Sequence, residues 1–142
     1  MIKKIQKIIN KNDLKRKRKK FKVIYPAYSK QKFFLREHIS KFILEKKLVP
    51  LNPFMNFNYF FGDTISRKLI YDVNDNLIRL ANELWVFDKV SDGVAAEIYY
   101  CEKELKIPVR YFKIKKDPKT GFYQFDEIQE TDIKVEKNSS QI

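Results

Sequence analysis

The chain has 142 residues, of which 44% are hydrophobic and 34% charged, and it contains 12 Phe, 8 Tyr and 1 Trp. These values predict one globular domain with a substantial core and exclude a chain that is disordered throughout. One Cys and one His exclude a disulfide scaffold and a zinc finger, and three glycines exclude both a Walker loop and a G-x-G-x-x-G turn. We therefore expect no metal site and no cofactor, and chemistry that depends mainly on carboxylates, hydroxyls and backbone N–H groups.

The net charge of +12 is concentrated at the start of the chain. Residues 1–22 hold 11 Lys or Arg against one acid, Asp13, and so carry +10 of it. We predict a basic N-terminal arm over residues 1–20, which either binds RNA, DNA or an anionic membrane nonspecifically or is only a solvated extension. Its isoleucines have a spacing that suits one helical face, namely Ile2, Ile5, Ile8 and Ile9. No stretch is apolar enough for a signal peptide or a membrane span, so a cytoplasmic location is expected.

From Phe21 onward, short strands alternate with amphipathic helices. In chain order we expect a strand over 21–25 that Pro26 ends, a helix over 31–47, a strand over 48–51, a helix over 64–81, a strand over 83–88, a helix over 91–105, a strand over 108–114, a turn over 117–121 and an edge strand over 122–125. In the first helix, four residues are expected on the packed face, namely Phe34, Ile39, Phe42 and Ile43.

This alternation predicts β-α-β units and the α/β class. We expect a single flavodoxin/Rossmann-like three-layer domain over residues 21–128, with a parallel sheet of four to five strands. The polar residues 129–142 are expected to form a disordered tail.

The segment 83–98 (ELWVFDKVSDGVAAEI) contains the main candidate site. Ligands bind open parallel sheets where strands end and helices begin. The strand is expected to end at Asp88, Ser91 to cap the next helix, and Gly93 to let a ligand approach the backbone of its first turn. Glu97 follows Gly93 by one helical turn, so its carboxylate is expected to point back at the same space. This geometry suits a nucleophile held against a bound sugar.

Simpler interpretations of these residues stay open. Serine and glycine also occur at the start of ordinary helices that bind no ligand, so Ser91 and Gly93 have a simple capping interpretation. A lone glutamate such as Glu97 is commonly a solvated surface acid. Asp88 either holds a ribose hydroxyl at the tip of its strand or only begins a loop. Tyr25 and Tyr28, near the end of the first strand, either line a pocket or are ordinary edge aromatics.

The same stretch resembles the hallmark of the nucleoside 2-deoxyribosyltransferase-like superfamily, whose pattern is close to D-E-L-W-V-F-x-x-x-x-S-[DE]-G-M-A-A-E-I. The matching residues are Asn82 to Phe87 and Ser91 to Ile98. Residues 106–112 (KIPVRYF) are similar to the next strand of that superfamily, and 23–29 (VIYPAYS) to its opening strand. Pro50 and Pro53 fit its second strand and the aromatic-rich loop that follows.

The resemblance implies a flavodoxin-like fold and a nucleoside or nucleotide substrate. Its catalytic glutamate, which attacks the anomeric carbon, falls on Glu97, and the serine and glycine that hold the 5′-phosphate in its nucleotide-cleaving members fall on Ser91 and Gly93. A further acid on the preceding helix falls near Asp72 or Asp75. The expected function is thus an N-glycosidase or deoxyribosyltransferase, and the alternative is a nucleotide-binding or sensing module without turnover.

The remaining candidates are aromatic residues and two single residues. The aromatic group over 54–61 either stacks on a base and covers a pocket, or belongs to the core or to a dimer interface. It consists of Phe54, Phe57, Tyr59, Phe60 and Phe61. Members of the superfamily form dimers that complete each other's sites, so the resemblance implies a homodimer. His38 is expected at the surface, and Cys101 is expected to be a core thiol.

Overall fold

The computed structural model describes residues 1–57 and 64–136. The strands are β1 (Val23–Ala27), β2 (Val49–Pro50), β3 (Glu83–Phe87), β4 (Lys89–Val90), β5 (Val109–Lys116), β6 (Tyr123–Ile128) and β7 (Lys134–Val135). The α-helices are α1 (Ile2–Gln6), α2 (Lys11–Leu14), α3 (Arg36–Glu45), α4 (Pro53–Asn56), α6 (Arg67–Arg79) and α7 (Asp92–Tyr99). Two 3₁₀ segments, η1 (Lys30–Leu35) and η3 (Glu130–Asp132), and one π-helical segment, η2 (Tyr100–Leu105), complete the described elements.

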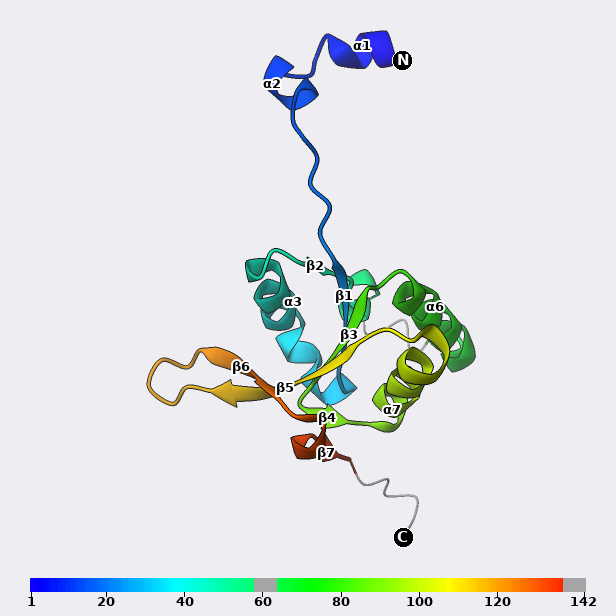
Figure 1. Cartoon of the computed structure of the whole chain (residues 1–142), viewed down its shortest axis with the longest axis vertical. Helices are drawn as coiled ribbons and strands as arrows, with labels where there is room; N and C mark the ends of the chain where they lie inside the picture. The colour runs from blue at the N-terminus through cyan, green and yellow to red at the C-terminus, as the bar shows by residue number, and fades with distance from the viewer. Residues whose placement is uncertain (58–63, 137–142) are drawn as a thin grey trace.

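A five-stranded, mostly parallel sheet forms the centre of this mixed α/β fold (Figure 1). Its strand order is β2-β1-β3-β5-β6, in which β6 alone pairs antiparallel to its neighbour. The predicted α/β class and the predicted number of parallel strands are confirmed. The edge strand expected over 122–125 is present as the longer β6.

Two hydrophobic clusters cover opposite faces of the sheet, because consecutive strand residues alternate between them. On one face, Ile24, Trp85, Phe87 and Phe112 pack with Leu35, Ile39 and Ile43 of the η1–α3 segment. On the other, Tyr25, Leu84, Val86 and Tyr111 pack with residues of α6, α7 and η2. In β3 the residues from Leu84 to Phe87 are fully buried, as expected of a strand covered on both faces.

Pro26 lies inside β1, so the prediction that it ends the first strand is wrong. The main-chain groups of Ile24 face β2, since its carbonyl accepts a hydrogen bond from Leu51 N–H at 2.8 Å. Pro26, two residues later, faces the same side, but β2 has already ended there. The N–H that proline lacks is therefore not needed in the sheet.

The first predicted helix is divided, and one of its packing residues was assigned wrongly. Residues 30–35 form η1 with three residues per turn before α3 begins, so the phase of the apolar face changes. As a result Leu35 is buried, whereas Phe34 is 58% exposed. Ile39 and Ile43 are buried as predicted.

The tail expected over 129–142 is folded as far as Glu136, so that prediction is wrong for its first half. Residues 130–132 form η3, and β7 pairs parallel with β4. Ile133 packs against the cluster on the α6–α7 face, which anchors the segment to the core. Residues 137–142 lie outside the described residues.

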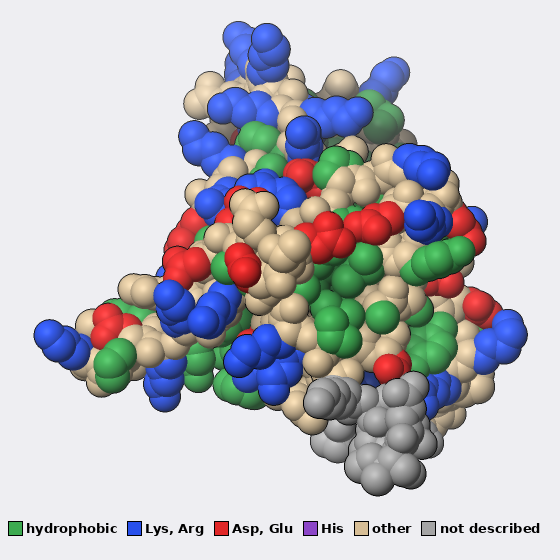
Figure 2. Space-filling view, turned by 60° about the horizontal axis from the view of Figure 1, so that its bottom comes forward, with side chains coloured by type: hydrophobic (Ala, Val, Ile, Leu, Met, Phe, Trp, Pro, Cys, Tyr) green, Lys and Arg blue, Asp and Glu red, His purple; other side chains and the backbone are tan. Residues whose placement is uncertain are grey.

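The N-terminal segment extends away from the sheet (Figure 1), and every residue from 1 to 22 is exposed. α1 and α2 are short, and the isoleucines 2, 5, 8 and 9 are not buried by any part of the chain that the structure describes. Figure 2 shows Lys and Arg side chains gathered over this segment at the top of the view, whereas charges of both signs mix over the rest of that face. The charge asymmetry seen in the sequence thus corresponds to two spatially separate regions.

Candidate functional site

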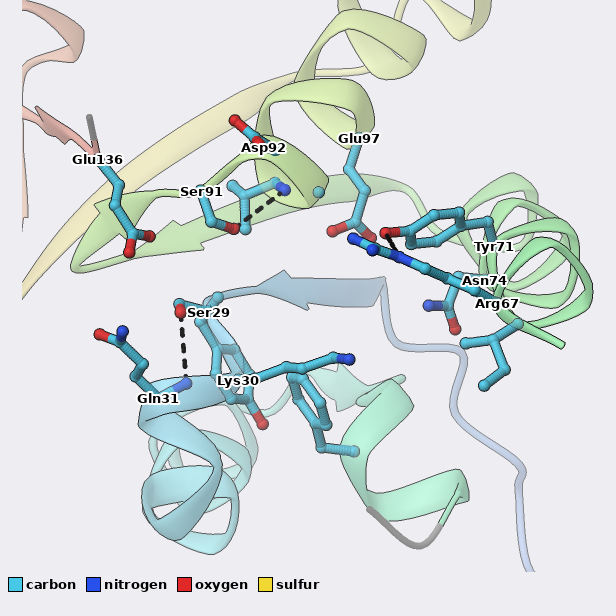
Figure 3. Close-up of a pocket in the computed structure, with 15 residues that line it drawn as sticks. Ser29, Lys30, Gln31, Arg67, Tyr71, Asn74, Ser91, Asp92, Glu97 and Glu136 are labelled. Atoms are coloured by element: carbon cyan, nitrogen blue, oxygen red, sulfur yellow. Dashed lines mark hydrogen bonds between the residues drawn. The ribbon is translucent and has the colours of Figure 1, made fainter. Parts of the chain in front are cut away.

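A cavity of about 520 Å³ lies beyond the ends of β1 and β3 (Figure 3). Three groups of residues form most of its wall: Tyr28 to Gln31, which follow β1; Ser91 to Val94, at the start of α7; and Arg67, Ile70, Tyr71 and Asn74 on α6. Phe54, Glu97 and Glu136 complete the lining. A volume of this size suits a small organic ligand such as a nucleoside.

The topology explains why the cavity lies there. The chain passes from β1 outward to β2 on one side, and then returns to place β3 on the other side of β1. The connections following β1 and β3 therefore diverge to opposite faces and leave a crevice at the carboxyl ends of these two strands. Ligands of open α/β sheets bind at such switch points.

The start of α7 supplies backbone donors to this crevice. Ser91 is the N-cap, and its Oγ accepts a hydrogen bond from Val94 N–H at 3.4 Å. A Cβ added to Gly93 would meet no heavy atom within 4 Å, so packing within the described chain does not require glycine at this position. The space above this first turn is open to a ligand.

Glu97 projects from α7 into the cavity (Figure 3). Its Oε2 atom is buried and has no hydrogen-bond partner among the described residues. Burial raises the pKa of this carboxyl to about 7, and the nearby negative charge of Asp75 adds to the rise. A carboxylate that faces a cavity and has a buried oxygen without a hydrogen-bond partner is a recognised feature of functional sites.

Tyr25 lies beside Glu97 under the cavity. Its hydroxyl interacts with the carboxylate and thereby opposes the rise in the pKa of Glu97, although neither group meets the geometry of a full hydrogen bond. Burial and the charge of Glu97 in turn hold the pKa of Tyr25 well above its usual value, so the phenol remains a neutral donor. Tyr25 is not itself part of the cavity lining.

Tyr28 lines the cavity with a side chain that the protein holds firmly. Its hydroxyl donates to Asn52 Oδ1 at 2.9 Å, and its ring lies 4.9 Å from that of Phe54. The buried Asn52 also donates to Ser40 Oγ at 3.0 Å and to the carbonyl of Arg36 at 3.2 Å. This network ties the wall formed by Tyr28 to α3.

Three of the predicted site acids lie outside the cavity wall. Asp88 follows β3 as expected, with a φ of 72°, but its carboxylate pairs with Lys32 at 3.6 Å. Asp72 is exposed on α6 and pairs with Lys68 at 2.8 Å. Asp75 acts on Glu97 through its charge, and burial raises its own pKa. Of the eight predicted site residues, the structure thus places Tyr28, Ser91, Gly93 and Glu97 on the wall.

The α6 wall was not predicted from the sequence, and neither were Lys30 and Glu136, two charged residues elsewhere in the lining. Arg67, Tyr71 and Asn74 are spaced so that they share one face of α6, and Asn74 Oδ1 is buried without a hydrogen-bond partner among the described residues. Arg67 Nε donates to Tyr71 Oη at 2.6 Å. An asparagine between Ile70 and Ile78 on an otherwise apolar stripe was the available signal. Lys30 and Glu136 gave no comparable signal, because one lies in a 3₁₀ segment and the other in the supposed tail.

The remaining candidates have structural positions. His38 is exposed, as predicted, with its ring 5.2 Å from that of Tyr123. Cys101 is a fully buried core thiol, also as predicted. Phe54 packs on Tyr28 and Phe33 and also lines the cavity, whereas Tyr59, Phe60 and Phe61 lie outside the described residues.

The fold and the cavity define a mixed α/β protein with a candidate small-molecule site at the switch point of its sheet. The chain belongs to the family described as "Domain of unknown function (DUF7768)", whose sequence profile matches residues 27–112. The matched range contains only the last residue of β1, but it contains all of β3 and α7 and most of the cavity wall. Comparisons with curated proteins and with solved structures gave no match.

Two further findings bear on the class of site. No helix within residues 1–57 and 64–136 combines the length and the hydropathy of a membrane-spanning segment. The same residues contain no group of three or more His, Cys, Asp or Glu side chains placed to hold a metal ion.

Proposed function

We propose that the protein cleaves or exchanges the N-glycosidic bond of a nucleoside or nucleotide, with Glu97 as the nucleophile. The observation that carries the proposal is the buried carboxylate of Glu97, which faces a nucleoside-sized cavity at the carboxyl ends of β1 and β3. The resemblance of residues 82–98 to nucleoside 2-deoxyribosyltransferase-like proteins independently assigns the nucleophile to the same residue.

The proposed fold is the three-layer flavodoxin-like one. Its support is the strand order β2-β1-β3-β5, which has the flavodoxin-like switch point between the first and third strands, together with the two apolar clusters on opposite sheet faces. In this arrangement Ser91 and Gly93 begin the helix that follows the central strand, which is where such folds bind ligands.

The proposed reaction proceeds through a covalent intermediate. A Glu97 carboxylate oxygen attacks C1′ of the sugar, the C1′–N bond breaks, and the base leaves with the bonding electrons and takes a proton. Water, or a nitrogen of a second base, then attacks C1′ and loses a proton. The ester bond between C1′ and the Glu97 oxygen breaks at the same time, which restores the carboxylate. The first acceptor gives hydrolysis and the second gives exchange.

The surroundings of Glu97 suit this role. Only the ionised carboxylate attacks, and a pKa of about 7 leaves a large ionised fraction at neutral pH while keeping the group more basic than an ordinary glutamate. Tyr25 stabilises the ionised form, and Asp75 disfavours it. Asp75 thus tunes the nucleophile in this proposal rather than touching the substrate.

The test compares Glu97→Gln with wild type on a panel of nucleosides and 5′-monophosphates, with free base followed by chromatography. Loss of the nucleophile is expected to lower base release by at least about 10³-fold. Glu102→Gln is the matched control, because Glu102 is exposed on η2 and does not line the cavity. Absence of base release from every compound, or equal release by Glu97→Gln, would refute the catalytic proposal.

A nucleotide-binding or sensing module is the second candidate. It is favoured by the positions of Asp72 and Asp75, since neither lines the cavity to protonate a leaving base. Calorimetry that shows a micromolar complex with a nucleoside or nucleotide, without any base release, would select this alternative.

The basic segment 1–20 suggests a further, separate contact. Its Lys and Arg side chains are exposed, which suits nonspecific and salt-sensitive binding to nucleic acid. Deletion of residues 1–20 is expected to abolish any RNA or DNA binding, and unchanged binding would exclude this role. The proposed homodimer is tested by sedimentation of the full chain and of the deletion variant.

A further inference from the structure

The N-terminal segment, residues 1–20, has an apolar side that no described part of the chain covers. The exposed fractions of Ile2 and Ile8 are 68% and 82%, and those of Ile5 and Ile9 are 36% and 37%. Single exposed apolar side chains are ordinary on protein surfaces, but four isoleucines in so short a segment form a cluster. A partner that removes this cluster from water gains the free energy of its burial.

The helical path of the segment separates its isoleucines from its lysines. Ile5 N–H donates to the carbonyl of Met1 at 3.0 Å, and Ile9 N–H donates to that of Ile5 at 3.1 Å, so the helical hydrogen bonds continue past the last residue of α1. At about 3.6 residues per turn, the isoleucines lie on one side of this path and three cations on the opposite side, namely Lys3, Lys4 and Lys7. An apolar side opposed by lysines is typical of helices that lie in the interface of a membrane.

A run of cations follows the amphipathic part. Residues 15–20 (KRKRKK) are all basic and all exposed, and Asp13 is the one acid in the segment. The segment extends away from the α/β domain (Figure 1), so the domain does not shield this run. A polybasic run is attracted to anionic lipids, and it adds to the weak binding of a short amphipathic helix.

Three kinds of partner differ in how much of the segment they satisfy. Nucleic acid would pair with the cations, but its phosphates and sugars would leave the isoleucines in water. A second copy of the segment would cover the isoleucines, but it would bring two strongly positive chains together. An anionic bilayer satisfies both sides, because its phosphates attract the cations and its acyl chains accept the isoleucines.

We infer that residues 1–20 bind the surface of an anionic lipid bilayer, with isoleucines 2, 5, 8 and 9 inserted at the acyl-chain boundary and the Lys and Arg side chains against lipid phosphates. The contact is peripheral and does not span the bilayer. It is independent of the proposed glycosidic chemistry. It also goes beyond the nucleic-acid contact proposed above, which uses the charges alone.

The experiment sediments the full chain with vesicles of phosphatidylcholine, or of equal parts phosphatidylcholine and phosphatidylglycerol, at physiological ionic strength. A parallel titration uses a short single-stranded RNA. Wild type is expected to bind the anionic vesicles at least about 100-fold more tightly than the neutral ones.

A double variant separates insertion from charge attraction. Ile2→Ser with Ile8→Ser keeps every charge, so it is expected to weaken vesicle binding at least about tenfold and to change RNA binding by less than about twofold. The matched control is Leu80→Ser with Val135→Ser, because these side chains are exposed to a similar degree, 68% and 70%, on the α/β domain. The control is expected to bind vesicles like wild type.

Three results would overturn the inference. Equal vesicle binding by wild type and the isoleucine variant would show attraction by charge alone. RNA binding without binding to anionic vesicles would assign the segment to nucleic acid. Self-association of wild type without lipid, lost in the isoleucine variant and accompanied by no vesicle binding, would assign the isoleucines to a second copy of the chain. Base release is measured separately, and none of these results bears on it.

Discussion

The two faces of the sheet differ in chemistry although the same strands supply both. On the α3 face, half of the buried side chains in the cluster are aromatic, and Phe87 stacks on Phe112 with ring centroids 5.2 Å apart. On the α6–α7 face, smaller aliphatic side chains surround titratable groups, among them Tyr25, Glu97 and Cys101. One face therefore contributes mainly apolar burial, whereas the other holds groups whose burial carries a cost.

This difference indicates how a small domain divides stability and function. Aromatic burial on the α3 face offsets the cost of holding a carboxylate and a phenol in a poorly hydrated site on the other face. Removal of an aromatic ring from the α3 face and removal of the buried Glu97 charge from the α6–α7 face are then expected to have opposite effects on the free energy of unfolding.

The largest expected effect comes from removing an aromatic ring on the α3 face. Phe87→Ala is expected to lower the free energy of unfolding by about 3–5 kcal/mol, because the fully buried ring also packs on Phe42 and Phe125. Denaturant titration measures the change. Phe34→Ala is the control, since this ring is 58% exposed and its loss is expected to cost less than about 1 kcal/mol. Equal losses in the two variants would show that burial of aromatic rings on the α3 face does not make the large contribution to stability that we assign to it.

On the opposite face, removal of the buried acid is expected to stabilise the protein in a pH-dependent way. The folded pKa of Glu97, about 7, lies above its unfolded value, so wild type loses stability as the pH rises from about 4.5 to 7. Glu97→Gln removes this loss and is expected to gain up to about 3 kcal/mol at pH 8 and little at pH 4. Denaturant titrations of both proteins across this pH range test the sign, and a difference independent of pH would show that the carboxyl is not desolvated.

A smaller effect is expected at the start of α7. Gly93→Ala places a methyl group in open space, and alanine favours the helix, so the free energy of unfolding is expected to rise by about 0.5–1 kcal/mol. If the ligand contacts this turn, the same methyl group weakens nucleoside binding. Thermal unfolding and calorimetry on the one variant measure both changes. A gain in stability with unchanged affinity would show that the ligand does not approach Gly93.

The sequence allowed the parallel sheet and the strand–helix unit around Glu97 to be predicted, because both depend on local patterns. The apolar run 84–87 between polar residues indicated a strand buried on both faces, and Ser91 marked the start of α7. In the structure, α7 and η2 pack on this cluster of the sheet through Val94, Ile98, Cys101 and Leu105.

The parts that failed depend on contacts between segments distant in sequence. Pro26 is compatible with β1 only because β2 is short, and the length of β2 is not a property of residues 21–25. β7 forms only because β4 offers it an edge, so Glu136 was hidden in a polar segment. For the same reason the Lys32 partner of Asp88 was not predictable from spacing alone.

An effect of similar size to that at Gly93 separates Tyr25 from its neighbours on the α6–α7 face. Its hydroxyl lowers the pKa of Glu97, so Tyr25→Phe is expected to raise that pKa and to move the rising limb of the pH–rate profile toward alkaline pH. The loss of one weak donor corresponds to about 1 kcal/mol, or roughly fivefold in kcat/KM at pH 6, with little change at pH 9 where Glu97 is ionised in both proteins. Tyr111→Phe is the matched control, because Tyr111 is buried in the same cluster and its phenol has no effect on the pKa of Glu97. A loss that is equal at both pH values, or that Tyr111→Phe reproduces, would assign Tyr25 to packing and would leave Asp75 and burial as the groups that set the basicity of Glu97.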